Sequence, residues 1–299
     1  MKNNQRIFIP GSNWVYFKIY TGIKTADKIL RDDISLIITK LKKKKIISKW
    51  FFIRYNDPDF HLRVRVYVEN KDNINEIISV FYKQLNSGLI NKEIWKVQLD
   101  TYQREMERYG FELIDEAESL FHFDSDCIIS VLKTIKLLNI DNYRWMIGLR
   151  LIDEILSNFS YDFQKKKNIM SFISNSYKKE FGFNDKNSKQ FSLKYRENKK
   201  NIELILTKEV NNENFMQIIS DINNRSLCFA PIINSINNKL LEHKNYNLDI
   251  LLSSYIHMTL NRLFRSKNRI YELLLYDFMY MYYSSEVAKA SVMIKKTNP

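Results

Sequence analysis

A short basic segment near the beginning of the chain carries the clearest chemical signal. Residues 54–65 read RYNDPDFHLRVR, and the end of this segment alternates polar with apolar residues. In a β-strand, that alternation places His61, Arg63 and Arg65 on one face, while Arg54 precedes the turn. A row of positive groups repels itself unless an anion neutralises it. The segment is therefore an anion-binding candidate, although a solvated basic face explains it equally well.

A second segment, 102–110 (YQREMERYG), has two arginines four residues apart. On a helix, Arg104 and Arg108 would face the same way, where like charges cost a few tenths of a kcal/mol. Glu105 and Glu107 would offset this as surface ion pairs, each worth roughly 0–1 kcal/mol. Alternatively, Arg104 lies near the end of a strand that neighbours the basic strand. It would then help to clamp a carboxylate, because arginine forms planar bidentate bonds with carboxylates.

A histidine near the C-terminal end is the third candidate. In the segment 257–263 (HMTLNRL), His257 and Asn261 are one helical turn apart. A histidine beside an amide can be an oriented acid–base group, because its ordinary pKa is about 6.5. A hydrogen-bonded histidine in the core is the simpler interpretation of this segment alone. His122 and His243 have no comparable neighbours, and we expect both to be structural.

The elements that must position these residues alternate in type along the first third of the chain. Apolar residues at a period of two predict strands, and helical spacing predicts helices. The order is strand, helix, strand, strand, helix, strand, at 14–20, 25–43, 46–55, 61–68, 73–85 and 94–102. This order is typical of a split βαβ, ferredoxin-like unit. We expect Thr25 to cap the first helix, and NDPD at 56–59 to form a turn.

Helical patterns dominate from residue 115 onward. We expect helices at 117–123, 126–138, 143–159, 214–223, 231–241 and 248–283, the last broken near Ser266. In the polar stretch 186–200 we expect a short strand at 191–195. The expected fold class is therefore α+β, a ferredoxin-like sheet unit followed by a mainly helical layer. We expect a single domain over 1–299, with its sheet-rich part at about 1–110 and its helical part at about 111–299.

Composition excludes several classes of protein. The chain has 299 residues, and its 45% of hydrophobic residues suffices for a core and excludes general disorder. Lys and Arg number 47 and Asp and Glu 34, so the net charge is +13. Much of this charge lies in lysine runs typical of solvated loops and helix ends. A general RNA-binding function would rest on charge alone and ranks last.

Cysteine content and apolar tracts indicate where the protein works. Cys127 and Cys228 do not make a disulfide framework, and with only 4 His a zinc cluster is not expected. The polar N-terminus has no apolar segment behind it that would indicate a signal peptide. The apolar tract 273–283 is far shorter than the ~20 residues of a membrane span. We therefore expect a cytoplasmic protein without a metal site.

Six segments, taken together and in order, resemble one known family. They are WVYFKIY at 14–20, RYNDP at 54–58, HLRVR at 61–65, YQREMERYG at 102–110, ESLFHFDS at 118–125 and HMTLNRL at 257–263. They resemble the C-terminal elimination domain of class I lantibiotic dehydratases, also found as free-standing thiopeptide-type bacteriocin biosynthesis proteins. Phe111 departs from the family, which often has a second glycine there. Because no N-terminal glutamylation domain precedes the match, we expect a stand-alone, split member.

The resemblance implies a reaction on a ribosomal precursor peptide. In this family a partner enzyme esterifies serine or threonine side chains with glutamate from glutamyl-tRNA. The elimination domain then removes the glutamate, leaving dehydroalanine or dehydrobutyrine, without a metal or redox cofactor. By resemblance, the catalytic arginines fall on Arg63, Arg65 and Arg104, which would bind the glutamyl group and the enolate, and the histidine on His257, which would transfer a proton. The expected substrate contacts are Arg54, His61, Glu105, Arg108 and Asn261.

The resemblance also implies partners and leaves alternatives open. The partners would be a precursor peptide with its leader and a separate glutamyl-tRNA-dependent dehydratase subunit, with no membrane and no direct nucleic-acid binding. An exposed sheet edge would also allow a homodimer. Related proteins join two dehydroalanines by a formal 4+2 cycloaddition into a pyridine, and these often lose part of the arginine and histidine set. A third possibility is a non-catalytic scaffold that binds the leader as an added strand.

Overall fold

The N-terminal part of the molecule is built on an antiparallel sheet of four strands, in a computed structural model that describes residues 5–207 and 213–297. From edge to edge the strands are β3 (Ile47–Asn56), β4 (Phe60–Val68), β2 (Trp14–Thr21) and β5 (Ile94–Leu99). The helices between them are α1 (Thr25–Lys28), α2 (Ser35–Lys43) and α3 (Ile74–Ile90). The first and third strands in sequence are adjacent, as in a ferredoxin-like unit. The predicted α+β fold is confirmed.

The two faces of β4 have different surroundings. Leu62 and Val64 are fully buried on the face that packs against α3. On this face Phe17, the cross-strand neighbour of Val64, stacks on Phe81 of α3 with 3.9 Å between ring centres. The basic residues of β4 alternate with these apolar residues and so lie on the opposite face. The apolar face thus fixes the strand, and the basic face is left for other contacts.

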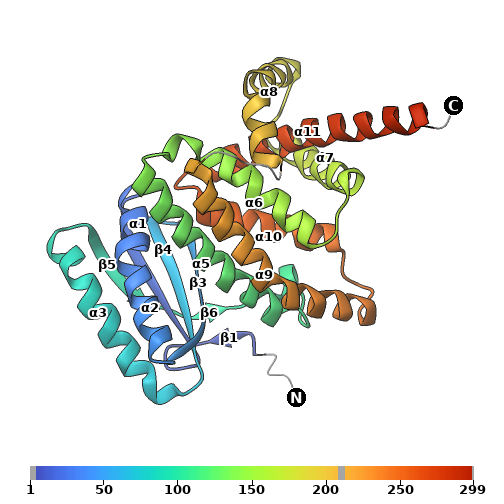
Figure 1. The fold of residues 1–299 in the computed structure, drawn as a ribbon. Helices are drawn as coiled ribbons and strands as arrows, with labels where there is room; N and C mark the ends of the chain where they lie inside the picture. Colours follow the sequence, from blue (N-terminus) through green and yellow to red (C-terminus); the bar gives the residue numbers. More distant parts are fainter. Residues whose placement is uncertain (1–4, 208–212, 298–299) are drawn as a thin grey trace.

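Helices on the other side of the sheet from α3 cover the outer edge of β3 (Figure 1). They are α5 (Ile114–Leu138) and α10 (Leu248–Leu263). Their side chains bond backbone N–H and C=O groups that the edge strand leaves free, at 2.9–3.2 Å. The side chains are His122 and Ser125 of α5 and Asn261 and Arg262 of α10. This edge is therefore closed to a further strand.

The opposite edge of the sheet, β5, has no strand beside it among the residues that the structure describes. Trp95, Val97 and Leu99 of β5 are all exposed. A sheet edge with free backbone groups and exposed apolar side chains can pair with another strand. The edge pairing that the sequence suggests for a leader peptide or a second copy is therefore available at β5 and closed at β3.

The predicted strand 94–102 is split in the structure. β5 pairs with β2, so the prediction that this strand is the direct neighbour of the basic strand β4 is wrong. After β5 the chain turns at Asp100, whose carboxylate pairs with Lys18 of β2. Tyr102 then begins a second, two-stranded sheet. The elements of this region are β1 (Ile7–Phe8), β6 (Tyr102–Gln103) and α4 (Met106–Tyr109).

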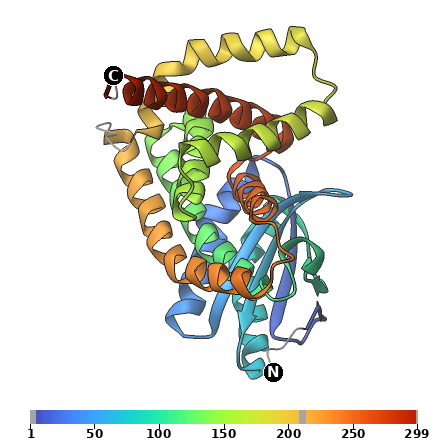
Figure 2. The same cartoon turned by 90° about the vertical axis from the view of Figure 1, so that its right-hand side faces the viewer.

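Long helices make up most of the remaining chain. They are α6 (Arg144–Asn158), α7 (Phe163–Glu180), α8 (Asp185–Leu206), α9 (Glu213–Glu242) and α11 (Asn268–Thr297). Figure 2 shows α7, α8 and α11 at the end of the molecule away from the N-terminus. The chain leaves α10 after Leu263 and enters α11 at Asn268, so the break predicted near Ser266 is confirmed.

The predicted strand at 191–195 is wrong, because this segment is part of α8. Phe191 and Tyr195 lie one helical turn apart and pack against aromatic residues outside the helix. Phe191 contacts Phe183 and Tyr195 contacts Phe278, at 4.8 and 5.9 Å between ring centres. A pair of aromatic residues at this spacing fits a helix face as well as a short strand, and tertiary contacts decide between them.

Helix boundaries differ from the prediction in several places. The helices predicted at 117–123 and 126–138 are one helix, α5, because the polar residues between them face β3 and buried arginines. Those predicted at 214–223 and 231–241 are also one helix, α9, which continues through its proline. Thr25 is the first residue of α1 and not its cap, and no side chain caps this helix.

Candidate functional site

Arg65 lies on the basic face of the sheet inside a cage of aromatic rings. Its guanidinium carbon is 4.3 Å from the ring centre of Tyr16, 4.7 Å from that of Tyr102 and 5.2 Å from that of Phe51. Arg65 is 6% exposed, and burial lowers its pKa. Among residues 5–207 and 213–297, it forms no ion pair, and its Nε has no hydrogen-bond partner. A buried cation without an anion is costly, so this geometry favours a bound anionic group.

Arg63 lies next to Arg65 on the same face and is oriented by two neighbours. Its guanidinium carbon is 3.3 Å from the ring centre of Tyr55, and its Nε donates to Nε2 of His61 at 3.1 Å. Nδ1 of His61 donates to the carbonyl of Asp59 at 2.8 Å. Burial, followed by nearby positive charges, lowers the pKa of His61, so this imidazole is neutral and accepts from Arg63. His61 therefore positions Arg63.

Tyr16 belongs to this face but is absent from the sequence-based prediction. It lies opposite Arg65 in the register of β2 and β4, is buried, and has no hydrogen-bond partner for its hydroxyl among the described residues. Burial raises the pKa of Tyr16, so the hydroxyl keeps its proton and remains a donor. Buried polar groups are normally hydrogen-bonded, so two unsatisfied neighbours indicate a ligand. The available signal was the alternation of Tyr16 and Lys18 in segment 14–20.

Arg104, predicted to be catalytic, is already neutralised within the protein. Its Nε and Nη2 bond the two carboxylate oxygens of Glu118 at 2.7 and 2.6 Å, and Nη2 also bonds Asp115 at 2.8 Å. Arg104 is 4% exposed. Burial opposes its charge, but the hydrogen bonds that Arg104 donates to Glu118 raise the pKa of Arg104. The carboxylate that the prediction assigned to the substrate is therefore supplied by the chain itself.

Arg104 still reaches the aromatic cage through one residue. Tyr102 donates its hydroxyl to Glu118 at 2.9 Å, and the same ring borders Arg65. Arg104 precedes α4, so the prediction that it shares a helix face with Arg108 is wrong. Arg104 thus holds Glu118, which in turn bonds Tyr102.

His257 of α10 is paired with a buried carboxylate of α11. Its Nδ1 lies 2.8 Å from Oε1 of Glu272, which is 0% exposed. Tyr177 donates its hydroxyl to Oε2 of the same carboxylate. The His257 side chain is 24% exposed, which leaves Nε2 for another group. A carboxylate that binds one imidazole nitrogen fixes the tautomer and leaves the other nitrogen for proton transfer. Glu272, 15 residues later, was not predicted because only the packing of α10 on α11 brings it there.

The side of α10 that carries His257 contacts other predicted site residues on both sides of His257. Ser254 accepts from Nε of Arg108 at 3.3 Å, and Asn261 bonds the backbone N–H and C=O of Arg54 at 2.9 and 3.0 Å. Ser254, His257 and Asn261 follow at steps of three and four residues, so they lie on one side of the helix. His257 is therefore between the two contacts. The predicted partnership of His257 with Asn261 is wrong, because the Asn261 amide is bound to β3.

The structure brings Arg63 and Arg65 together but does not join them directly to His257. No hydrogen bond or ion pair links His257 to either arginine in the described part of the chain. α10 nevertheless reaches the strand beside the aromatic cage, because Arg262 donates to the backbone C=O of Phe52, the residue after Phe51 of the cage. The predicted catalytic residues therefore form two groups, an arginine half on β4 and a histidine half on α10.

The other residues predicted to contact the substrate form bonds within the protein. Arg54 is buried, and its Nη2 bonds Asp27 at 2.7 Å. Asn261 uses both ends of its amide on β3. Glu105 and Arg108 form a pair at 3.3 Å, with side chains 61% and 38% exposed. The surface-pair interpretation of these two residues therefore describes their geometry.

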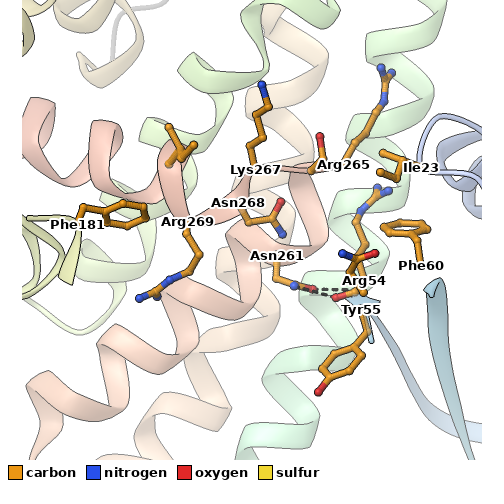
Figure 3. Close-up of a pocket in the computed structure, with 13 residues that line it drawn as sticks. Ile23, Arg54, Tyr55, Phe60, Phe181, Asn261, Arg265, Lys267, Asn268 and Arg269 are labelled. Atoms are coloured by element: carbon orange, nitrogen blue, oxygen red, sulfur yellow. Dashed lines mark hydrogen bonds between the residues drawn. The ribbon is translucent and has the colours of Figure 1, made fainter. Parts of the chain in front are cut away.

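A cavity of about 590 Å³ adjoins both halves of the site without containing Arg65 or His257 (Figure 3). It opens between the β3–β4 hairpin, the connection from α10 to α11 and the end of α7. Tyr55 lines it and stacks on Arg63. Arg269 also lines it and lies 3.5 Å from Glu272, the partner of His257. One residue thus connects the cavity with each half of the site: Tyr55 with Arg63, and Arg269 with the Glu272 partner of His257.

The described residues show neither a metal site nor a membrane-spanning helix. Within residues 5–207 and 213–297, no group of three or more His, Cys, Asp or Glu side chains could hold a metal ion. None of the described helices combines the length and apolar character needed to span a bilayer.

His122, expected to be structural, accepts a hydrogen bond from the backbone N–H of Trp50 at 3.2 Å.

Comparison with known sequences identifies the family. Residues 14–283 match the family described as lantibiotic biosynthesis dehydratase C-term. The subtilin biosynthesis protein SpaB of Bacillus subtilis is 24% identical over 188 residues, which are 60% of this chain and 17% of SpaB. The nisin biosynthesis protein NisB of Lactococcus lactis subsp. lactis is 28% identical over 187 residues, 58% of this chain and 17% of NisB. The chain thus spans a small part of each relative's length.

Solved structures show the same fold. The tRNA-dependent lantibiotic dehydratase MibB from Microbispora sp. 107891 matches with a TM-score of 0.70 at 18% identity, over 91% of this chain and 28% of MibB. The pyridine synthase TbtD from thiomuracin biosynthesis matches with a TM-score of 0.64 at 10% identity, over 91% of this chain and 99% of TbtD. Because the sequence match covers most of the chain, this protein belongs to the family of lantibiotic biosynthesis dehydratase C-terminal domains.

Proposed function

We propose that this chain removes glutamate from glutamylated serine or threonine side chains of a ribosomal precursor peptide, leaving dehydroalanine or dehydrobutyrine. One observation carries the proposal: Arg63 and Arg65 present two guanidinium groups on one face of β4, and in the described residues neither has a carboxylate partner. Membership of the dehydratase family supports a role in modifying a precursor peptide. The relatives' names place them in subtilin and nisin biosynthesis.

The arginines match the charges that develop in an elimination. A base removes the α-proton, the electron pair of that bond forms the Cα–Cβ double bond, and the Cβ–O bond breaks to release glutamate as a carboxylate. Negative charge grows on the peptide carbonyl and on the leaving carboxylate. Arg65, with the Tyr16 hydroxyl beside it, stabilises the enolate in this proposal, and Arg63 binds the glutamyl group. Preorganised donors in a site of low dielectric constant often contribute several kcal/mol.

His257 transfers the proton through Nε2 in this mechanism. Glu272 accepts from Nδ1 and so keeps Nε2 available as an acceptor for the α-proton. The imidazole later returns the proton to solvent or to the departing glutamate, so the protein ends the cycle unchanged. Arg104 acts indirectly, through Glu118 and Tyr102, on the cage around Arg65. The partners in this proposal are the precursor peptide and a separate subunit that attaches glutamate.

The test is the conversion of a synthetic peptide that carries one O-glutamyl serine. The full chain should produce a peptide lighter than the unmodified one by one water, as measured by mass spectrometry. Arg65→Ala and His257→Ala should each retain the glutamyl adduct, with a rate loss of about 10²–10³-fold. Arg196→Ala, an exposed arginine of α8, is the control and should react at the wild-type rate. Undiminished conversion by both site variants would refute the assignment.

Two other outcomes would replace the proposed function. If the glutamylated peptide stays unchanged while an already dehydrated precursor is consumed with release of its leader, the protein is a 4+2 cyclase. If the leader binds but no peptide changes mass in either reaction, the protein is a binding scaffold.

A further inference from the structure

Three exposed apolar side chains line the cavity beside the site, and Figure 3 shows two of them, Ile23 and Phe181, on opposite sides of it. Ile23 precedes α1, Phe181 follows α7, and Ile270 lies in the first turn of α11; they are 40%, 42% and 53% exposed. Single exposed apolar residues are common, but apolar residues from separate elements that line one concavity indicate a binding site. A volume of about 590 Å³ is within the range of ligand-binding pockets, about 300–1,000 Å³.

Polar atoms of the lining residues indicate what the ligand contains. Nη1 of Arg54 and Oδ1 of Asn268 are buried and have no hydrogen-bond partner in the described part of the chain. One is a donor and the other an acceptor, which is the complement of a peptide group with its C=O and N–H. The lining also includes three further basic residues and no Asp or Glu, so a cationic segment is disfavoured. These basic residues are Arg265, Lys267 and Arg269.

The position of the cavity connects it with the proposed reaction. Tyr55 forms part of its wall, and the guanidinium carbon of Arg63 lies 3.3 Å from the centre of the same ring. Asn261 also lines it and lies one turn from His257 along α10. A peptide whose reacting residue is held by Arg63 and reached by His257 would therefore extend its neighbouring residues into this cavity.

We propose that the cavity binds the residues of the substrate peptide that flank the glutamylated serine or threonine, and that it takes an apolar side chain of that stretch. The inference rests on the proposed function, since it names the same peptide as the occupant. It predicts that the protein prefers peptides with a large apolar residue, and without lysine or arginine, next to the reacting position.

A binding experiment without turnover tests this preference. Three fluorescein-labelled heptapeptides carry a central 2,3-diaminopropionate, which holds glutamate through an amide and so resists elimination. The central residue is flanked by phenylalanine, glycine or lysine on both sides, and affinities for the full chain are measured by fluorescence anisotropy. Burial of a phenylalanine side chain should make the first peptide bind about tenfold tighter than the second. The lysine peptide should bind more weakly than the glycine peptide.

Two matched variants locate the preference. Ile270 and Ile250 are each the third residue of a long helix and each 53% exposed, but only Ile270 lines the cavity. Ile270→Ser should reduce the preference for phenylalanine over glycine several-fold, and Ile250→Ser should keep it. Equal thermal unfolding of the two variants verifies that both are folded.

Three results would overturn the inference. They are no binding of any probe, equal binding of the phenylalanine and glycine peptides by the wild type, and equal loss of preference in both variants. The readout needs no reaction, so it is separate from the proposed function. A protein that shows the preference but eliminates no glutamate contradicts only the function. A protein that eliminates glutamate without the preference contradicts only the peptide subsite.

Discussion

Strands β3 and β4 are neighbours in one sheet, but their polar surroundings are opposite. Along β3, helix side chains bond the edge backbone groups, and the buried Arg54 is paired with Asp27. On β4, Arg63 and Arg65 have no carboxylate partner in the described residues, although Arg65 is as buried as many structural arginines. Pairing around β3 holds the fold together, whereas the unpaired cations of β4 cost stability. The difference teaches that pairing, more than burial, separates structural arginines from candidates for ligand binding.

The largest effect is expected at Arg104, which belongs with the structural arginines in this comparison. Arg104→Ala leaves Glu118 buried without its cation and should lower the free energy of unfolding by about 3–5 kcal/mol, measured by urea denaturation. The double variant Arg104→Met with Glu118→Met removes both charges and should recover most of this loss. A double variant that folds normally but eliminates no glutamate would return Arg104 to a direct catalytic role.

Arg65→Met should lower the elimination rate without lowering the stability of the fold. We expect the elimination rate to fall about 10²–10³-fold, because a donor to the developing enolate is lost. The free energy of unfolding should stay equal or rise, since an unpaired buried charge is replaced by an apolar side chain. Arg262→Met is the matched control: Arg262 is equally buried but bonds Asp124 at 3.0 Å, and its loss should cost about 3 kcal/mol. Equal destabilisation by both variants would remove the distinction between the two strands.

Acid should weaken the β3 edge through His122. Burial lowers the pKa of His122 to about 4, whereas the unfolded chain has about 6.5. Between these values the unfolded state binds the proton more readily, so stability present above pH 6.5 is lost as the pH falls towards 4. The slope is up to about 1.4 kcal/mol per pH unit. His122→Gln should show a shallower pH dependence of unfolding than the wild type, and identical slopes would contradict this role.

The smallest effect is expected for Tyr16→Phe. If its hydroxyl donates to the substrate beside Arg65, the elimination rate should fall about tenfold, the value of one hydrogen bond. Stability should not fall, because the hydroxyl has no partner to lose in the described residues. Tyr255 also has a buried hydroxyl without a partner but lies on α10 against Tyr109. Tyr255→Phe should therefore leave the rate unchanged, and a loss of rate in both variants would point to packing instead.

The sequence predicts features that depend on local geometry. The alternation in segment 61–65 predicts correctly that Arg63 and Arg65 share a face, because a strand repeats every two residues. The order of strands and helices along the first third of the chain was predicted from the same periodicities and agrees with the elements observed, whereas the neighbour predicted for the last strand is wrong. The strand at 191–195 fails for the opposite reason, since its short apolar pattern fits either structure.

The sequence did not predict which distant side chains pair with each other. Arg104 was predicted to bind substrate because nothing in its segment indicates that Glu118 of α5 will bond it. His257 was assigned Asn261 as a neighbour, whereas the packing of α10 against α11 supplies Glu272. Such partners lie on different elements and are chosen by tertiary contacts, so a reading of local spacing finds the reactive group but not its partner.

The asymmetry of the sheet edges also limits how the molecule can self-associate. An open sheet with two bare edges can add copies without end, as in a fibre. Here helices occupy one edge of the four-stranded sheet, so within the described residues β5 is the edge of this sheet where another strand can be added. If two copies pair through β5, neither copy keeps a free edge of this sheet, so the assembly stops at a closed dimer.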